Sequence, residues 1–377
     1  MLTELLRDLV AIDSVNPDLV PGAKGEAEVA GHCARWLSRA GLDVALQEAA
    51  PGRPNAVGVL EGSAPGRTLM LCGHIDTVGV EGMAAPFTPE ERGGRLYGRG
   101  SQDMKGGVAA MMEAARRVKD RWKAGRLIVA CVADEECESL GAQAVVKTWT
   151  ADAAVVTEPT DLTVAVTHKG FAWMEVETRG RAAHGSRPAE GRDAILRIGR
   201  VLARLESLDA DLSRRPADPL TGPPSLHASM ISGGREWSVY PDRARLRYER
   251  RTVVGETDAS VDAELEALLA ALRAADPELE IEGRRVTSRP PYALDPAHEL
   301  PARLGALARA RGAAAPVAGM SFWTDAAILG EAGIPSVLFG PGGAGLHSVE
   351  EYVTLADVET CAAVLADLAV EYCGIKS

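Results

Sequence analysis

The sequence lacks any apolar run of the roughly 18 to 20 residues that a membrane-spanning helix requires. Its first stretch, MLTELLRDLVAIDSVNP, reads as an amphipathic helix with acids among the apolar residues. That stretch has neither the cationic start nor the small-residue cleavage site of a secretory signal. From these absences we expect a soluble, cytoplasmic protein.

Closely spaced cysteine pairs and basic clusters are missing as well. The six cysteines are spread along 377 residues, and Cys72 and Cys131 fall in apolar runs. This spacing argues against a disulfide framework and favours reduced, buried thiols. The formal net charge is -12, with arginines mixed among glutamates. Such a balance argues against nucleic acid or an anionic membrane as a partner.

What the sequence does contain is an alternation of strand-like and helical stretches. At 46% hydrophobic residues, the chain is large enough for two domains with real cores. Strands are predicted at 56–60, 68–73, 127–133, 153–157 and 335–339, and helices at 26–40, 104–119, 140–150, 326–332 and 356–372. This order predicts an α/β domain with a mostly parallel central sheet flanked by helices, whose ligand site lies at the carboxyl ends of the strands.

The pattern changes between about 165 and 287. Residues 172–178 and 244–248 alternate like half-buried strands, and residues 193–208 and 259–274 read as helices. We therefore predict that residues 166–287 form an inserted α+β domain. Residues 1–165 and 288–377 would form the main domain, with a return linker at 288–291.

Histidines and acids gather where the predicted strands end. Each alone has an ordinary explanation, such as a turn residue or a hydrogen-bonded histidine. Their concurrence at one sheet edge is harder to explain in that way, and imidazoles mixed with carboxylates suit zinc. The segments are LCGHIDTV with His74 and Asp76, YGRGSQDMKGG with Asp103, VADEEC with Glu135 and Glu136, VVTEPT with Glu158, and GPGGAGLHSVEEY with His347.

Six segments together resemble the dinuclear zinc amidohydrolases, the family of acetylornithine deacetylase, succinyl-diaminopimelate desuccinylase, aminoacylases and glutamate carboxypeptidases. They are GHIDTV, GRGSQDMKGG, ADEE, TEPT, AAHGSRP and LHSVEEY, and they occur in order over nearly the whole chain. The resemblance implies a zinc-binding α/β domain interrupted by a lid domain that often dimerises. We therefore expect an enzyme that works as a homodimer.

The resemblance also implies a set of metal ligands. His74 and Glu158 would bind one ion, Glu136 and His347 the other, and Asp103 would bridge both. Two zinc ions, three carboxylates and a bridging hydroxide sum to zero charge, which is reasonable for a buried site. We expect two zinc ions per subunit, although cobalt or manganese fits the same ligands.

Three further residues receive catalytic roles from the resemblance. Glu135, beside Glu136, would be the general base that takes a proton from the metal-bound water and returns it to the leaving amine. Asp76 would accept a hydrogen bond from the His74 ring and fix its tautomer, unless it is only a turn cap. His184, in GRAAHGSRP, would reach the partner subunit's active site and stabilise the oxyanion.

Substrate contacts are expected from the lid and from a glycine run. Arg251 matches the family's lid arginine, whose fork of donors grips a substrate carboxylate. Gly340, Gly342 and Gly343 in FGPGG could add backbone N–H donors, although a glycine run alone indicates only a turn.

The chain also departs from the family pattern. Asp193 and Ser238 stand where many relatives carry asparagine, and Ala327 stands where desuccinylase-like members tend to carry arginine. These differences weaken a desuccinylase assignment and leave the acyl group and the amino acid open. Asp134 has no assigned role.

Our first hypothesis is a hydrolase that cleaves the amide bond of an N-acyl amino acid, with acetyl as the expected acyl group. A dipeptidase or carboxypeptidase with the same dinuclear chemistry is the alternative. A non-catalytic metal-binding relative would have lost the base or a ligand, whereas all of them are present here. A dinucleotide-dependent dehydrogenase is excluded because no predicted strand leads into the full arrangement of a GxGxxG segment, a helix that opens on it and a following acid. GPGGAG follows the strand at 335–339, but the next predicted helix begins only at 356.

Overall fold

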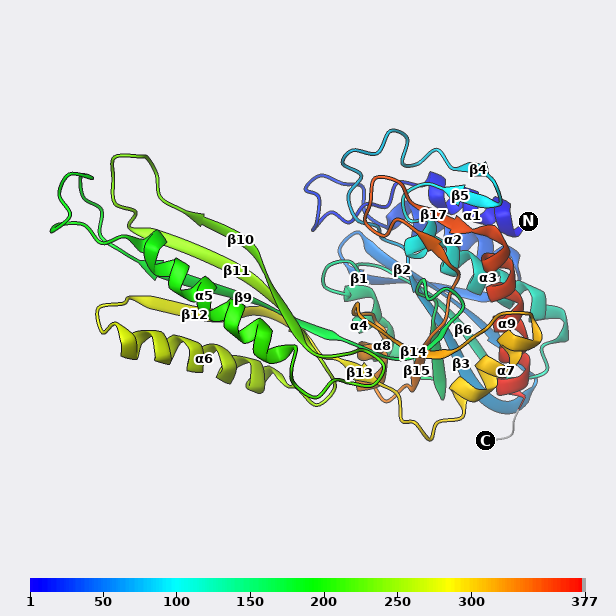
Figure 1. The fold of residues 1–377 in the computed structure, drawn as a ribbon. Coiled ribbons are helices and arrows are strands. Elements are labelled where there is room, and N and C mark those ends of the chain that lie inside the picture. The colour runs from blue at the N-terminus through cyan, green and yellow to red at the C-terminus, as the bar shows by residue number, and fades with distance from the viewer. Residues whose placement is uncertain (375–377) are drawn as a thin grey trace. The chain divides into compact units, whose positions relative to one another are not determined.

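The computed structural model describes residues 1–374, which form two compact units (Figure 1). The first unit contains Met1–Val166, Leu294–Ala318 and the chain from Thr324 onward. The second contains Thr167–Ala293 and Gly319–Trp323. The expected insertion at 166–287 therefore falls in the second unit, apart from its first residue.

The predicted return linker at 288–291 is wrong at its start. Ser288 and Arg289 continue a strand that pairs with Ala172 and Phe171. These residues still belong to the β12–β9 ladder, and the chain stays in the second unit until Ala293.

The first unit holds most of the helices and strands. Its elements, of which β8 and β14 run on into the second unit, are α1 (Leu2–Ala11), α2 (Ala27–Arg39), β1 (Asp43–Ala50), β2 (Arg53–Glu61), β3 (Ala64–His74), β4 (Glu90–Arg92), β5 (Arg95–Tyr97), η1 (Ser101–Lys105), α3 (Gly106–Val118), η2 (Lys119–Arg121), β6 (Ala124–Val132), α4 (Leu140–Thr148), β7 (Ala153–Val156), β8 (Val164–His168), α7 (Leu300–Ala310), β14 (Val317–Met320), α8 (Ala326–Glu331), β15 (Ser336–Leu338), β16 (Gly343–Ala344), β17 (Tyr352–Thr354) and α9 (Leu355–Cys373).

The central sheet is mixed. Its order is β1-β2-β6-β3-β7-β15-β8-β13, with β14 beside β8. The inner pairs β6/β3, β3/β7 and β7/β15 are parallel, whereas β1/β2, β2/β6, β15/β8 and β8/β13 are antiparallel. The inner strands are buried along both faces, as their continuous apolar runs predict. Because β3, β6 and β7 run in the same direction, their carboxyl ends meet at one edge of the sheet.

Two further features of the first unit position the site. Helices α3 and α9 pack against each other and against β3. A small second sheet has the order β16-β17-β5-β4. It brings the segment after β5, which carries Asp103, beside the loop between β16 and β17, which carries His347.

The second unit is a four-stranded antiparallel sheet with two helices. Its strands have the order β10-β11-β9-β12, and its further elements include β13. One face of the sheet alternates into a core with α5 and α6, as the period-two pattern predicts. The bounds are β9 (Gly170–Arg179), α5 (Ala194–Leu212), β10 (Ser225–Gly233), β11 (Arg243–Thr252), α6 (Asp258–Ala275), β12 (Ile281–Arg289) and β13 (Tyr292–Ala293).

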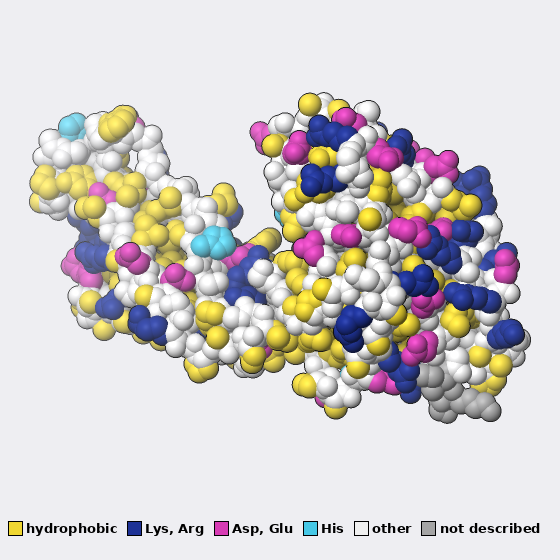
Figure 2. All heavy atoms as spheres, turned by 45° about the vertical axis from the view of Figure 1, so that its right-hand side comes forward, with side chains coloured by type: hydrophobic (Ala, Val, Ile, Leu, Met, Phe, Trp, Pro, Cys, Tyr) yellow, Lys and Arg dark blue, Asp and Glu magenta, His cyan; other side chains and the backbone are white. Residues whose placement is uncertain are grey.

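The surface charges and the cysteines agree with a charged exterior and reduced thiols in the described residues. On the face drawn in Figure 2, Lys and Arg side chains are interspersed with Asp and Glu. Within residues 1–374, no helix is both long enough and apolar enough to cross a membrane. All six cysteines are free thiols, five of them buried and Cys137 half-buried. The expected cytoplasmic location stays a prediction.

Candidate metal centre

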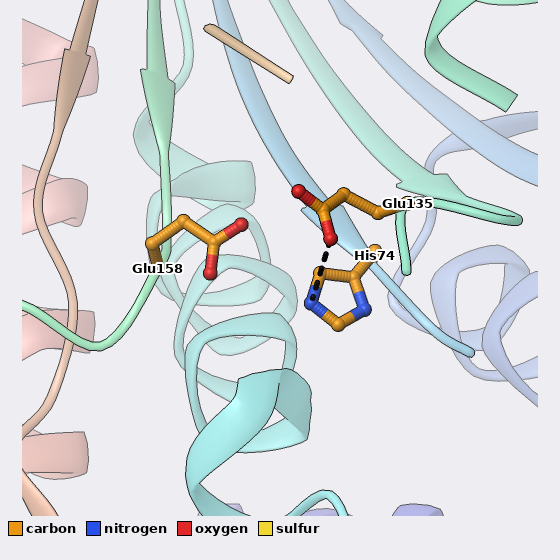
Figure 3. A group of neighbouring side chains, drawn as sticks. All are labelled: His74, Glu135 and Glu158. Carbon is orange, nitrogen blue, oxygen red and sulfur yellow. Dashed lines mark ion pairs between the residues drawn. The ribbon is translucent and has the colours of Figure 1, made fainter. Parts of the chain in front are cut away.

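Four of the predicted site residues lie at the shared carboxyl edge of the central strands. His74 is the last residue of β3, Glu135 and Glu136 lie in the turn after β6, and Glu158 follows β7 by two residues. In Figure 3 the carboxylates of Glu135 and Glu158 approach the His74 ring from separate strands. The parallel arrangement of β6, β3 and β7 produces this convergence from segments far apart in sequence.

Asp103 lies between the two histidines. Its Oδ1 is 3.0 Å from Nε2 of His74, and its Oδ2 is 3.3 Å from Nε2 of His347. One carboxylate therefore faces two imidazoles, each with a different oxygen. A carboxylate that bridges two metal ions needs this arrangement.

The remaining carboxylates divide between the two histidines. Oε2 of Glu136 is 3.3 Å from Nε2 of His347, and Oε2 of Glu135 is 4.0 Å from Nε2 of His74. Ligand atoms of His74, Glu135 and Glu158 all lie within 4.8 Å of one another. The same holds for His74, Asp103 and Glu136.

Without bound metal, the buried acids are close enough to repel one another when they are ionised. Burial, together with neighbouring carboxylates, raises the pKa of Glu135 and of Glu158 well above the ordinary value. For Asp103, burial acts in the same direction, but hydrogen bonds to His347 and His74 outweigh it and lower the pKa. Either protons or cations must therefore compensate this cluster at neutral pH.

The donor set fits two divalent cations. It combines two imidazoles with carboxylates, which zinc accepts, and the bridging carboxylate stands between the histidines. Oε1 of Glu136 is buried and has no hydrogen-bond partner within residues 1–374. A bound cation would satisfy this orphaned oxygen, and it would also offset the charge of the acids around it.

Asp76 contacts the His74 ring through its backbone oxygen and, at a longer distance, its carboxylate. The Nδ1–H of His74 donates to the backbone oxygen of Asp76 at 3.0 Å, whereas the carboxylate oxygen Oδ1 is 3.5 Å away. This contact leaves Nε2 of His74 as the ring nitrogen available to a metal ion. The Asp76 carboxylate also accepts the backbone N–H groups of Glu135 and Glu136, at 3.1 and 3.2 Å.

A buried ion pair that the sequence reasoning missed holds the Asp103 segment. The carboxylate of Glu351 accepts from Nη1 of Arg99 and from the backbone N–H groups of Gly100, Gln102 and Asp103. These four distances are 2.7 to 3.1 Å. The segment HSVEEY did not reveal this role, because its two adjacent acids look alike in sequence. In the structure Glu350 is exposed and Glu351 is buried just before β17.

Asp325 was also missed. It is buried at the start of α8, and burial raises its pKa to about 7, against a smaller opposing influence of His74. Its Oδ1 has no hydrogen-bond partner in the described chain. The sequence signal was the TDAA segment, where Thr324 and Asp325 precede a helix as ordinary capping residues do.

Two predicted site residues belong to the second unit. His184 is exposed, and its Nδ1 accepts the backbone N–H of Ser186 at 3.2 Å, which places the ring proton on Nε2. Arg251 donates from Nε to Glu249 at 2.6 Å and lies over the ring of Phe171 at 5.6 Å. Both side chains are thus held locally, His184 as a hydrogen-bond donor and Arg251 as a cation.

The expected substrate contacts of the glycine run are not supported. The N–H of Gly340 donates to Thr160, and the N–H of Gly342 donates to Asp357. Gly343 pairs with Val353, and a Cβ there would lie 2.1 Å from a backbone oxygen. These glycines permit close backbone packing, and we do not propose them as substrate donors.

One departure from the family pattern has a structural explanation. The side chain of Asp193 accepts from the backbone N–H of Leu196 at 2.9 Å and caps α5. The backbone oxygen of Ser238 accepts from the N–H of Gly185, beside His184. Ala327 is buried in α8.

Comparisons with known proteins agree with this geometry. Residues 70–371 match the family described as "Peptidase family M20/M25/M40". The chain is 34% identical to acetylornithine deacetylase of Myxococcus xanthus, over 99% of this chain and 98% of the relative. It is 28% identical to N-formyl-4-amino-5-aminomethyl-2-methylpyrimidine deformylase of Bacillus subtilis, over 94% and 92% of the two chains. Among solved structures, a tripeptidase from Staphylococcus aureus gives a TM-score of 0.80 at 20% identity, over 98% of this chain and 96% of the other.

Proposed function

The chain belongs to the M20/M25/M40 peptidase family, and from this membership we propose that it is a dinuclear metal hydrolase that deacylates an N-acyl amino acid. The observation that carries the proposal is Asp103, whose two oxygens face two different histidines among further buried carboxylates. Acetyl is the first choice of acyl group, because the relative at 34% identity over both lengths is an acetylornithine deacetylase.

The proposed division of the metal ligands is the one that the family resemblance implies. Two bound divalent ions, zinc first and cobalt or manganese as substitutes, would polarise the scissile carbonyl and lower the pKa of the attacking water. His74 and Glu158 would hold one ion, and Glu136 and His347 the other. Asp103 would contact both, each with one oxygen.

Glu135 is the proposed general base. Its backbone is held by Asp76, and its carboxylate lies 4.0 Å from the His74 ring. From this position Glu135 would take the proton of the attacking water and pass it to the leaving nitrogen, so that the amine departs neutral.

The second unit is proposed to complete the site within a homodimer. His184 would donate from Nε2 to the developing oxyanion in the partner subunit's site, a role that suits the tautomer set by Ser186. Arg251 would bind the carboxylate of the substrate's amino acid.

A substrate panel tests this proposal. Zinc-loaded and cobalt-loaded protein would be assayed with N-acetylornithine, other N-acetyl and N-formyl amino acids, dipeptides and a tripeptide. We expect kcat/KM for at least one N-acetyl amino acid to exceed that for every peptide by about tenfold or more. A preference for dipeptides would replace this assignment by the peptidase alternative. A protein that holds two metals and hydrolyses no amide would contradict the proposed function.

A further inference from the structure

A buried guanidinium lies behind the loop that carries Glu135 and Glu136. Arg53, the first residue of β2, is 7% exposed. It donates from Nε and Nη2 to the two oxygens of Glu26, each at 2.5 Å. Nη2 also donates to Oδ1 of Asp134 at 2.7 Å, and Nη1 donates to Asp18 at 2.6 Å. The fork geometry of arginine lets one side chain donate hydrogen bonds to several carboxylates at once, which a lysine ammonium cannot do equally well.

Asn16 extends this network toward the metal centre. It is fully buried, and its backbone N–H donates to the carbonyl oxygen of Thr77, one residue after Asp76. The side-chain Nδ2 donates to Asp134 at 2.9 Å and to Asp76 at 2.8 Å. The two hydrogens of this amide nitrogen therefore each donate to a different buried carboxylate, so that Asn16 bridges the two.

The hydrogen-bond network ends at the backbone of Glu135 and Glu136, the proposed base and a proposed metal ligand. The Asp76 carboxylate, fixed from behind by Asn16, accepts the backbone N–H groups of Glu135 and Glu136. Asp134, fixed by Asn16 and Arg53, has a φ of 69°, a region that non-glycine residues rarely adopt. Its Oδ2 accepts the N–H groups of Glu138 and Leu140, which shape the turn after β6.

The same acids could be mistaken for another metal site. Oxygens of Glu26, Asp76 and Asp134 lie within 4.8 Å of one another, as ligands would. However, Arg53 donates to Glu26 and Asp134, and Asn16 donates to Asp134 and Asp76. The oxygens of this cluster are therefore already hydrogen-bonded by side chains of the protein, whereas Oε1 of Glu136 in the other cluster has no partner in the described residues.

We propose that Arg53 and Asn16 are positioning residues of the metal centre. They fix Asp134 and Asp76, and through these two carboxylates they set the backbone of Glu135 and Glu136. The catalytic consequence rests on the proposed function, whereas the consequence for metal binding does not.

Two variants and one matched control test this inference. Arg53→Lys keeps a positive charge but loses the fork that reaches three carboxylates. Asn16→Ala removes the bridge between Asp134 and Asp76 without changing any charge. Arg197→Lys is the control, because Arg197 is 8% exposed in the second unit and donates only to the backbone oxygens of Arg179 and Glu278 in the contacts found for it.

Zinc binding is the first readout, measured by calorimetry on zinc-free full-length protein with zinc alone. We expect the zinc affinity of Arg53→Lys and of Asn16→Ala to fall by about 10- to 100-fold, as for other residues that orient metal ligands. The control should retain the parent affinity, even if its melting temperature falls. Should Arg53→Lys fail to fold, Asn16→Ala decides the question by itself.

Turnover is the second readout. With saturating zinc, we expect kcat to fall by about tenfold or more in both variants while KM stays within about threefold, because the misplaced groups are the base and the metal ligands. Zinc affinity and kcat both within about threefold of the parent, at a stability loss like that of the control, would overturn the inference. If the parent hydrolyses no amide at all, the proposed function fails, and the zinc titration still tests the positioning role.

Discussion

Glu135 and Glu136 are neighbours in sequence, yet they face different partners. Asp76 receives both backbone N–H groups, while the two carboxylates approach His74 and His347 respectively. Adjacent residues in an irregular turn point in different directions, so a ligand and a base can share one short segment. A mutation of Glu135 can therefore test its proposed role as base separately from the proposed role of Glu136 as metal ligand.

Glu135→Gln is expected to lower kcat by about 100- to 10,000-fold, because the amide cannot accept the proton of the attacking water. Two zinc ions per subunit should remain bound, as measured by elemental analysis after gel filtration. Glu61→Gln, an exposed acid paired with Arg126, is the control for loss of a carboxylate. A variant that keeps full activity would remove the base role, and a variant with one zinc would make Glu135 a ligand.

His168 provides a pH test that is independent of the metal centre. Its Nδ1 donates to the backbone oxygen of Lys169, and its buried Nε2 has no partner within the described residues. Burial lowers the pKa of His168 to about 4. Between pH 6.5 and 4 the unfolded chain binds this proton and the folded chain does not. The free energy of unfolding therefore falls as pH decreases through this window, by up to about 3 kcal/mol.

His168→Asn keeps a donor for the Lys169 oxygen and removes the titrating ring. We expect this variant to lose stability less steeply between pH 7 and pH 5 than the parent, in urea unfolding followed by tryptophan fluorescence. His227→Asn, on the exposed side of β10, should keep the parent's slope. Equal slopes for the parent and His168→Asn would contradict the assignment of this proton.

At the scale of elements, the beginning of α3 packs closely against the strand end that carries Glu158. A Cβ on Gly107 would lie 2.0 Å from the backbone oxygen of Thr157, which is the residue before Glu158. No side chain fits in this contact without moving one backbone segment away from the other. Glycine is therefore required here by close approach and not by a special backbone angle.

Gly107→Ala is expected to lower the melting temperature by several degrees and to weaken zinc binding, because Glu158 moves with its strand end. Gly199→Ala is the matched control in the middle of α5, where a Cβ meets nothing within 4 Å. That control should be neutral or more stable by about 0.5 to 1 kcal/mol, since alanine favours helix. Differential scanning calorimetry compares the two, and equal zinc affinity in Gly107→Ala and parent would refute the coupling.

Which elements form was largely predictable from periodicity. The strand at 68–73 lies within β3, and the helix at 26–40 matches α2 within one residue at each end. Strand β1 was missed because half of its side chains are exposed and its alternation is weak. The antiparallel pairing of the outer strands of the central sheet was missed as well. They depend on which strands pair, and this pairing is a long-range property.

The ligand types were predictable, whereas their supports were not. His74 and Glu158 stand at or just after the carboxyl ends of parallel strands, where ligand sites of such sheets lie, and Asp103 lies in a glycine-rich turn. Arg53 and Asn16 act through contacts with residues up to 118 positions away, which no local pattern contains. In the sequence, the only sign of their role is that the charged Arg53 and the amide of Asn16 lie next to apolar segments.

At the scale of the whole molecule, metal binding and stability should be linked. The buried carboxylates repel one another in the metal-free chain, and cations bound to the folded state stabilise it by mass action. We expect removal of zinc with a chelator to lower the melting temperature and abolish activity. Two equivalents of zinc should restore both, in a titration followed by calorimetry. Full restoration by one equivalent would contradict a dinuclear centre.

The proposed homodimer makes a second prediction at this scale. Glu135→Gln and His184→Ala should each be nearly inactive, but in mixed dimers one site would combine an intact Glu135 with the partner's intact His184. Random exchange of subunits would return about a quarter of the parent activity. Light scattering would establish the dimer first. Mixtures that stay at the activity of the single variants, after verified subunit exchange, would place His184 outside the partner's site.

The ion pair of Arg99 and Glu351 has a consequence for biosynthesis. It joins the segment of Asp103 to a segment about 250 positions later, and His347 lies just before that later segment. On the proposed ligand sets, a nascent chain emerging from the ribosome would hold His74, Asp103 and Glu158 long before His347. The proposed second ion would gain its histidine only when the last tenth of the protein is synthesised. Loading of both ions would then be among the final events in the maturation of each polypeptide.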